Sequence, residues 1–154
     1  MSRAVVQRNP GIRHRVAGIY AKDGKILLVK HRKANREYYL LPGGGQESGE
    51  CAEEALRREW FEELNLKVKV GDFIFCGESV PVEERRTQVF QMVFQIKEID
   101  GIIKVETDGA LVGYDWIAIN QIDNIPFFPD CLEQVKAFCR GEKFNAYQRY
   151  KWLN

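Results

Sequence analysis

Three glutamates on one short stretch of this chain are spaced so that they could bind a metal ion together. Glu59 lies three residues before Glu62 and four before Glu63, in a segment of good helix formers with no internal breaker. Residues at these intervals share one face of an α-helix, so the three carboxylates are expected to project together. Like charges this close destabilise a helix by roughly 0.2–0.5 kcal/mol per pair, and a bound cation would offset that cost.

The chemistry of these side chains indicates which ion they would take. Carboxylate oxygens are ligands that Mg²⁺ and Mn²⁺ prefer. Protein-bound Mg²⁺ usually takes one or two carboxylates together with substrate phosphates, so a diphosphate is the expected missing ligand. Arg58 lies four residues after Glu54 and four before Glu62, and is expected to orient the carboxylates through pairs at this spacing. The alternative for a Glu-rich helix is a solvated acidic face that binds nothing.

The neighbouring segments would position these glutamates. Pro42 and the three glycines after it cannot form a helix, and a helix is predicted from Glu50 to Leu64. Asn65 follows, and asparagine is second only to glycine as a left-handed helix end. The glycine-rich entry, the intervals and the adjacent Arg-Glu pair together favour a metal site over a solvated acidic face.

This stretch resembles the Nudix box, the signature of hydrolases that cut nucleoside diphosphates linked to another group. The resemblance rests on the following residues at the family's intervals: Pro42, Gly43, Gly44, Glu47, Gly49, Glu50, Arg58, Glu59, Glu62 and Glu63. Asn65 stands where the family usually has Gly, and Tyr39 stands where many members have Trp. The resemblance implies an α/β fold of the Nudix type, an α/β/α sandwich with a curved mixed sheet.

The resemblance also implies roles for individual residues. The expected ligands of Mg²⁺ or Mn²⁺ are Glu59, Glu62, Glu63 and the Gly43 carbonyl. The expected catalytic residues are Arg58, Glu59 and Glu62. Glu59 or Glu62 is the favoured general base, and Glu106, in a later loop, is the second candidate. Gly44, Tyr39 and Arg86 are predicted to contact the substrate. Core packing is the alternative for Tyr39, and an ordinary surface charge is the alternative for Glu106 and Arg86.

The sequence says less about the substrate. Pro81 lies about fifteen residues beyond the box, and a proline there resembles the ADP-ribose pyrophosphatase subgroup. ADP-ribose or a nucleotide sugar is therefore favoured. The alternatives are a nucleoside triphosphate pyrophosphohydrolase that removes modified nucleotides, a hydrolase of capped RNA ends, and a non-catalytic Nudix-like nucleotide-binding module.

Composition favours a small-molecule enzyme in one domain. The chain has 154 residues, 45% of them hydrophobic, and a net charge of +1, so no strong field favours nucleic acid or a membrane. A single domain over residues 1–154 is expected, with a peripheral aromatic and basic tail at 140–154. No long apolar run or signal peptide is recognised, which predicts a cytoplasmic protein. Four buried or half-buried reduced cysteines are expected, and a homodimer is left open.

Local patterns predict the remaining elements. A hairpin is expected around Asp23-Gly24, and a polar loop is expected over 31–37. The segment 87–97 is expected to be a strand with mainly one buried face, and a charged loop containing Pro81 should precede it. The other predicted strands are 16–21, 25–30, 38–41, 66–70, 72–79 and 113–119. A second helix is predicted over 130–139, opened by Pro129 and ended by Gly141.

Overall fold

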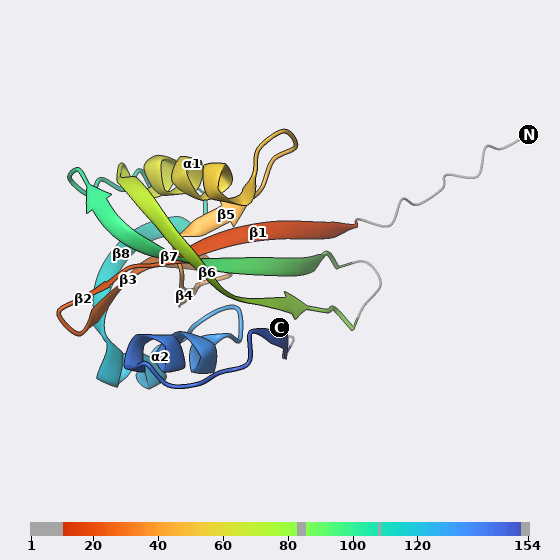
Figure 1. Cartoon of the computed structure of the whole chain (residues 1–154). Helices are drawn as coiled ribbons and strands as arrows, with labels where there is room; N and C mark the ends of the chain where they lie inside the picture. The colour runs from red at the N-terminus through yellow and green to blue at the C-terminus, as the bar shows by residue number, and fades with distance from the viewer. Residues whose placement is uncertain (1–10, 83–85, 108, 152–154) are drawn as a thin grey trace, which may run out of the picture.

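Two α-helices cover opposite sides of a layer of β-strands (Figure 1). The computed structural model describes residues 11–82, 86–107 and 109–151. Helix α1 (Ala52–Leu64) lies above the strands in this view, and α2 (Leu132–Arg140) lies below them. The predicted α/β/α sandwich with a curved mixed sheet is therefore confirmed. No helix in the described ranges is long and apolar enough to cross a membrane.

The first sheet has the strand order β5-β1-β7-β6-β9. Its strands are β1 (Ile12–Ile19), β5 (Gly43–Gly45), β6 (Lys67–Ser79), β7 (Gln88–Asp100) and β9 (Tyr147–Tyr150). The sheet is mixed. Strand β1 runs parallel to β7, and β6 runs parallel to β9. Strand β5 pairs antiparallel with β1, and β6 pairs antiparallel with β7. Strand β6 is continuous through Gly71, where a break was predicted, because a register shift against β7 absorbs the irregularity.

The second sheet is built around β3 (Lys25–Lys33). Strands β2 (Ala21–Lys22), β4 (Arg36–Leu40) and β8 (Leu111–Ala118) all pair with it antiparallel. The Asp23-Gly24 turn is confirmed, with φ of 53° and 74°, but it joins β3 to the short β2. The longer strand before it, β1, ends at Ile19 and belongs to the first sheet.

The prediction of a polar loop over 31–37 was wrong. Strand β3 continues to Lys33, and a tight turn at Ala34 and Asn35, both with positive φ, leads into β4. Arg32 and Glu37 lie opposite each other in the register and form an ion pair. The charges of this segment reflect an exposed hairpin tip, where polar side chains are compatible with strand pairing.

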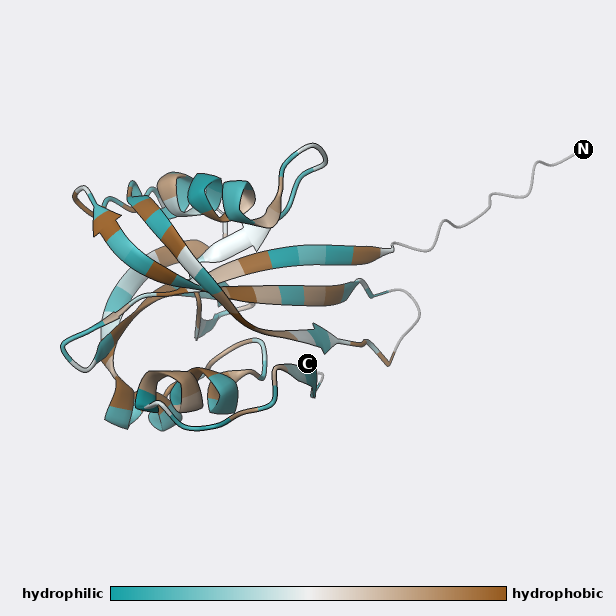
Figure 2. Cartoon of the chain, in the orientation of Figure 1, coloured by the Kyte–Doolittle hydropathy of each residue, from teal (hydrophilic) through white to brown (hydrophobic). Residues whose placement is uncertain are grey.

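Each helix packs on its own hydrophobic core. Alternating residues of β3 point to opposite faces, with Leu27 and Val29 in the core under α1 and Ile26 and Leu28 in the core over α2. In Figure 2, hydrophobic and hydrophilic residues both occur along the strands that lie between the two helices. The expectation that β7 has mainly one buried face was wrong, because this strand is central and both cores receive its side chains.

Helix α1 ends at Leu64 as predicted, whereas the other helix ends differ from the predicted ones by one or two residues. Helix α1 begins at Ala52 rather than Glu50, and the Cys51 N–H donates to the Glu54 carboxylate at 3.2 Å. Helix α2 begins at Leu132, so Pro129 precedes the helix instead of opening it. The left-handed end at Asn65, with φ of 60°, and the end of α2 at Gly141 are both confirmed, and Gly141 is also left-handed, with φ of 68°.

The C-terminal segment packs against the body through β9. The Tyr150 side chain is buried, and its hydroxyl group donates to Gln134 Oε1 at 3.1 Å. A Cβ atom on Gly77 would lie 2.0 Å from the Tyr150 ring, so only glycine allows this close approach. Trp152, part of the predicted aromatic tail, lies outside the described residues, as do residues 83–85 of the charged loop.

All four cysteines are free thiols. The expectation that all four are buried or half-buried was wrong at Cys51, which is exposed because it caps the surface end of α1. Burial is complete at Cys131, where it raises the pKa of the thiol to about 12.

The left-handed end of α1 can be tested at Asn65. A residue with a Cβ and no compensating side-chain bond costs roughly 1 kcal/mol in this conformation, so Asn65→Ala should lower the free energy of unfolding by about that amount. Asn65→Gly should change it by less than about 0.5 kcal/mol. Urea unfolding of the three proteins measures both values, and equal losses for Ala and Gly would contradict the left-handed cap.

Candidate active site

Two glycines of β5 lie directly against their neighbours, Gly44 against the Glu59 side chain of α1 and Gly43 against the backbone of β1. A Cβ on Gly44 would lie 2.3 Å from the carboxylate carbon of Glu59, and a Cβ on Gly43 would lie 2.0 Å from the Val16 carbonyl oxygen. Both contacts are far closer than a side chain permits. The Trp60 indole N–H donates to the Pro42 carbonyl at 3.0 Å and holds the entry to this strand. Gly43 therefore allows β5 to lie directly on the backbone of β1, and Gly44 leaves room for the Glu59 carboxylate.

Arg58 ties the glycine strand to the helix. Its Nε and Nη2 donate to the two oxygens of Glu50 at 3.1 and 2.6 Å, and Nη2 also donates to the Gly45 carbonyl at 3.0 Å. The predicted pairing of Arg58 with Glu54 was wrong, because the Glu54 carboxylate accepts from the Cys51 N–H at the helix start. A bidentate arginine–carboxylate pair of this kind fixes both groups in orientation as well as distance.

The remaining terminal nitrogen of Arg58 lies between two glutamates. Its Nη1 donates to Glu59 Oε1 at 2.9 Å and to Glu62 Oε2 at 3.3 Å. A single cationic atom is thus shared by two of the three carboxylates that were predicted to bind a metal. The pairing of Arg58 with Glu62 four residues on is confirmed.

The ionisation of these groups follows from their contacts. Hydrogen bonds from Arg58 and from the Glu47 N–H lower the pKa of Glu50. Glu50, followed by Glu59, raises the pKa of Arg58. Burial raises the pKa of Glu59 above its ordinary value, against the opposing effect of Arg58. Loss of water on folding therefore disfavours the negative charge of Glu59.

Glu63 turns toward a different set of partners. Its Oε1 accepts a hydrogen bond from the Gly43 N–H at 2.9 Å, and its Oε2 lies 3.8 Å from His31 Nε2. The structure therefore brings Gly43 and Glu63 together through the Gly43 N–H, while the Gly43 carbonyl stays a predicted ligand. Sequence reasoning missed His31, because the segment was assigned to a polar loop. The usable signal was its alternation with Leu27 and Val29 along β3.

The site has the ligand chemistry for Mg²⁺ or Mn²⁺. Within the described ranges, no group of three acidic, histidine or cysteine side chains already converges to hold an ion. However, Arg58 Nη1 demonstrates that Glu59 and Glu62 both reach one positive atom, and Mg²⁺ usually requires no more than two carboxylates with water and phosphate. The residues present therefore fit a hard divalent cation.

The other predicted site residues have different surroundings. Tyr39 packs on the α2 side of the sheet, where its hydroxyl group donates to Asp115 Oδ2 at 2.6 Å and Lys30 Nζ lies 5.1 Å from its ring centre. Arg86 is exposed just before β7. Glu106 is exposed on the connection between β7 and β8, a connection that approaches the end of α1 where the Lys104 N–H donates to the Leu64 carbonyl at 3.0 Å.

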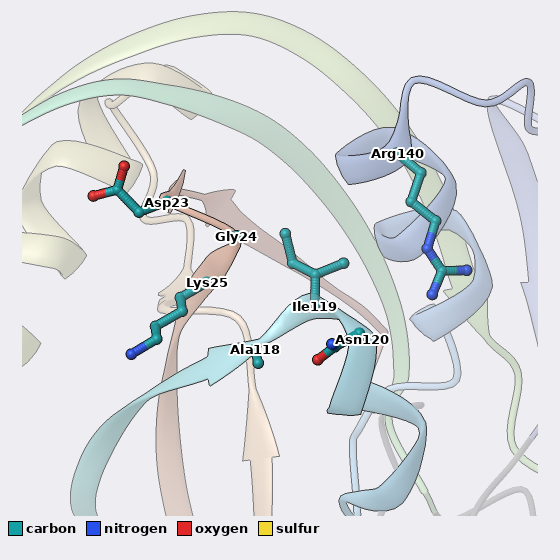
Figure 3. Close-up of a pocket in the computed structure, with 7 residues that line it drawn as sticks. All are labelled: Asp23, Gly24, Lys25, Ala118, Ile119, Asn120 and Arg140. Atoms are coloured by element: carbon teal, nitrogen blue, oxygen red, sulfur yellow. The ribbon is translucent and has the colours of Figure 1, made fainter.

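A surface pocket of about 430 Å³ lies elsewhere on the molecule (Figure 3). Its walls come from the β2–β3 turn, the end of β8, the start of a 3-10 helix (Ile119–Asn124) and the last residue of α2. The lining residues are Asp23, Gly24, Lys25, Ala118, Ile119, Asn120 and Arg140. Among the described residues that line it, none comes from α1 or β5. This pocket is therefore distinct from the glutamate cluster.

Comparison with known proteins identifies the family. The NUDIX domain model matches residues 12–137, which includes β5, α1 and the core under α1. The chain belongs to the Nudix family. An ADP-ribose pyrophosphatase of Methanocaldococcus jannaschii is 42% identical over 114 residues, which are 73% of this chain and 65% of that protein. A Klebsiella pneumoniae protein, NAD-capped RNA hydrolase NudC, is 29% identical over 79% of this chain and 46% of its own length.

The chain thus spans less than two thirds of these two relatives. Among solved structures, the Escherichia coli ORF135 protein superposes with a TM-score of 0.71 at 22% identity, over 84% of this chain and 90% of that one. At this identity the match supports the Nudix fold alone.

Burial of Glu59 gives a pH-dependent prediction for the Nudix helix. The pKa of Glu59 is higher in the folded state than in the unfolded state, so folding favours the protonated carboxyl group. The resulting stabilisation is fully present below the unfolded-state pKa and is lost as pH rises through the folded-state pKa. Glu59→Gln should therefore raise the melting temperature relative to the parent at pH 7 and give a smaller gain at pH 4. Calorimetry in EDTA measures both values, and a larger gain at pH 4 would contradict this assignment.

Proposed function

We propose that this protein hydrolyses the diphosphate linkage of a nucleoside diphosphate joined to another group, in a reaction that depends on Mg²⁺ or Mn²⁺. The observation that carries the proposal is the position of Arg58 Nη1 between the Glu59 and Glu62 carboxylates, beside a glycine strand. A cation can therefore lie between these two carboxylates, next to glycine backbone that a phosphate group would approach. Nudix family membership supports the same reading.

The proposed ligands are the Glu59, Glu62 and Glu63 carboxylates and the Gly43 carbonyl. The bound metal would supply charge neutralisation to the phosphoryl oxygens. Arg58 would keep the glutamates oriented by holding Glu50 and Gly45 at the same time. Gly44 stays a predicted substrate contact, and it leaves room for the Glu59 carboxylate, with which a Cβ would collide.

We assign Glu59 as the favoured general base for the attacking water. A base is most effective when its pKa lies near the working pH, and burial moves the pKa of Glu59 upward in that direction. Glu62 is the alternative within the helix, and its side chain is 58% exposed, which leaves it better solvated. Glu106 remains the candidate outside the box.

The favoured substrate is ADP-ribose or a nucleotide sugar. The 42% identical relative is an ADP-ribose pyrophosphatase, and Pro81 follows β6 at the position that resembles this subgroup. A nucleoside triphosphate and a non-catalytic nucleotide-binding role are the alternatives. The substrate partner is thus a small nucleotide, and Tyr39 and Arg86 stay predicted contacts. A cytoplasmic location and a single domain over residues 1–154 also stay predictions.

A second candidate is hydrolysis of NAD-capped RNA. The 29% identical Klebsiella relative carries that activity in its name. Polymeric substrates are usually met by a basic surface, whereas the net charge of this chain is +1. A steep loss of turnover with rising salt would favour RNA, and salt-insensitive turnover would favour a small nucleotide.

The proposed function is tested by turnover of a nucleotide panel. ADP-ribose, UDP-glucose, dinucleoside polyphosphates and nucleoside triphosphates would be incubated with Mg²⁺ and with EDTA. ADP-ribose should give AMP and ribose 5-phosphate with Mg²⁺ and no product in EDTA. Glu62→Gln should lower kcat by about 100-fold or more while leaving the fold intact.

The matched control is Glu53→Gln, since Glu53 is an exposed residue of the same helix that pairs with Arg57. This variant should retain the parent's turnover within about twofold. Undiminished cleavage in EDTA, or a Glu62→Gln enzyme within about threefold of the parent, would contradict the proposed mechanism.

A further inference from the structure

His31 holds an unpaired nitrogen beside the proposed metal site. Its Nε2 is buried and has no hydrogen-bond partner among the described residues. Buried polar atoms are nearly always paired, so an exception indicates a partner that this arrangement does not supply. The carboxylate oxygen of Glu63 lies 3.8 Å away, just beyond hydrogen-bonding distance.

We propose that His31 is a positioning residue that holds Glu63 in the orientation in which it binds the metal ion. This inference rests on the metal-binding role proposed above for Glu63. A shift of about 1 Å between the two side chains would bring Nε2 and Oε2 to an ordinary hydrogen-bond distance. In the proposed arrangement, the Nε2–H donates to Glu63 Oε2.

The other oxygen of Glu63, Oε1, is already held by a backbone donor. The Gly43 N–H donates to Oε1 at 2.9 Å, so a bond from His31 to Oε2 would constrain both ends of the carboxylate. Each oxygen keeps a second lone pair for a cation. Donors of this kind orient metal ligands, and their loss typically costs 10–100-fold in metal affinity or activity.

The surroundings of His31 support a fixed orientation. It lies on β3, in alternation with Leu27 and Val29, which places its side chain on the α1 face of the sheet. The Tyr38 ring packs 5.8 Å from the imidazole, centre to centre. The side chains of His31 and Glu63 are only 21% and 14% exposed, so water competes weakly for their polar atoms.

The test measures Mn²⁺ binding directly, by electron paramagnetic resonance of free Mn²⁺ in the absence of substrate. His31→Leu removes the donor and should weaken binding by about 10-fold. His31→Gln places an amide nitrogen at a similar reach and should recover most of that affinity. His14→Leu is the matched control on an exposed histidine of β1, and it should bind Mn²⁺ like the parent.

A double-mutant cycle separates positioning from a general structural effect. In a Glu63→Gln background, His31→Leu should change Mn²⁺ affinity by less than about twofold, because its target is gone. Melting in EDTA reports whether each variant is folded. If His31→Leu does not fold, His31→Asn replaces it, since the shorter amide cannot reach Glu63 and the same loss is expected.

Three results would overturn the inference. In the first, His31→Leu binds Mn²⁺ with an affinity within about twofold of the parent. In the second, His31→Leu weakens Mn²⁺ binding equally in the parent and in the Glu63→Gln background. In the third, the parent does not bind Mn²⁺. If the parent binds Mn²⁺ and the variants behave as expected but no nucleotide is cleaved, the proposed function fails while the role of His31 stands. If nucleotides are cleaved and the His31 variants bind Mn²⁺ normally, only the role of His31 fails.

Discussion

The hydrogen bonds of Arg58 are the interaction on which the candidate site depends. One guanidinium group joins the Glu50 carboxylate, the Gly45 carbonyl and the carboxylates of Glu59 and Glu62. These groups come from β5, from the turn before α1 and from the helix itself. A lysine could not replace this set, because a single ammonium group lacks the planar fork that reaches Glu50 with two nitrogens.

The hydrophobic core under α1 supports this cluster. Helix α1 buries Ala55, Leu56, Trp60 and Leu64 in one core. Across the same helix, exposure rises from Glu59 and Glu63, at 18% and 14%, to Glu62 at 58%. The carboxylates therefore lie at the boundary between core and solvent, where charge is less screened than in water and a substrate can still approach.

Much of this arrangement could be predicted from the sequence because it is local. The helix, its left-handed end at Asn65 and the Arg58–Glu62 pair depend on spacing along a single element. That the glycine-rich segment before the helix is not itself helical also follows from its composition, and the structure places it in strand β5.

The contacts that were missed all join segments far apart or compete with a local alternative. His31 and Glu63 meet only because β3 lies under α1, which no spacing along the chain reports. Glu54 could have paired with Arg58 on the helix surface, but the Cys51 N–H at the helix start binds it instead. The 31–37 hairpin was misread because surface charge indicates exposure and says nothing about strand pairing.

The central claim is that the positive charge of Arg58 between Glu59 and Glu62 marks the position of a divalent metal. The most direct test is a crystal structure with Mn²⁺ and a non-hydrolysable α,β-methylene analogue of ADP-ribose, with the ion located by its anomalous scattering. We expect Mn²⁺ to bind Glu59 and Glu62 in this crystal structure. Arg58 Nη1 should be displaced from the two carboxylates, while the hydrogen bonds from Arg58 to Glu50 should be retained. Manganese bound elsewhere, with Arg58 still between the two glutamates, would contradict it.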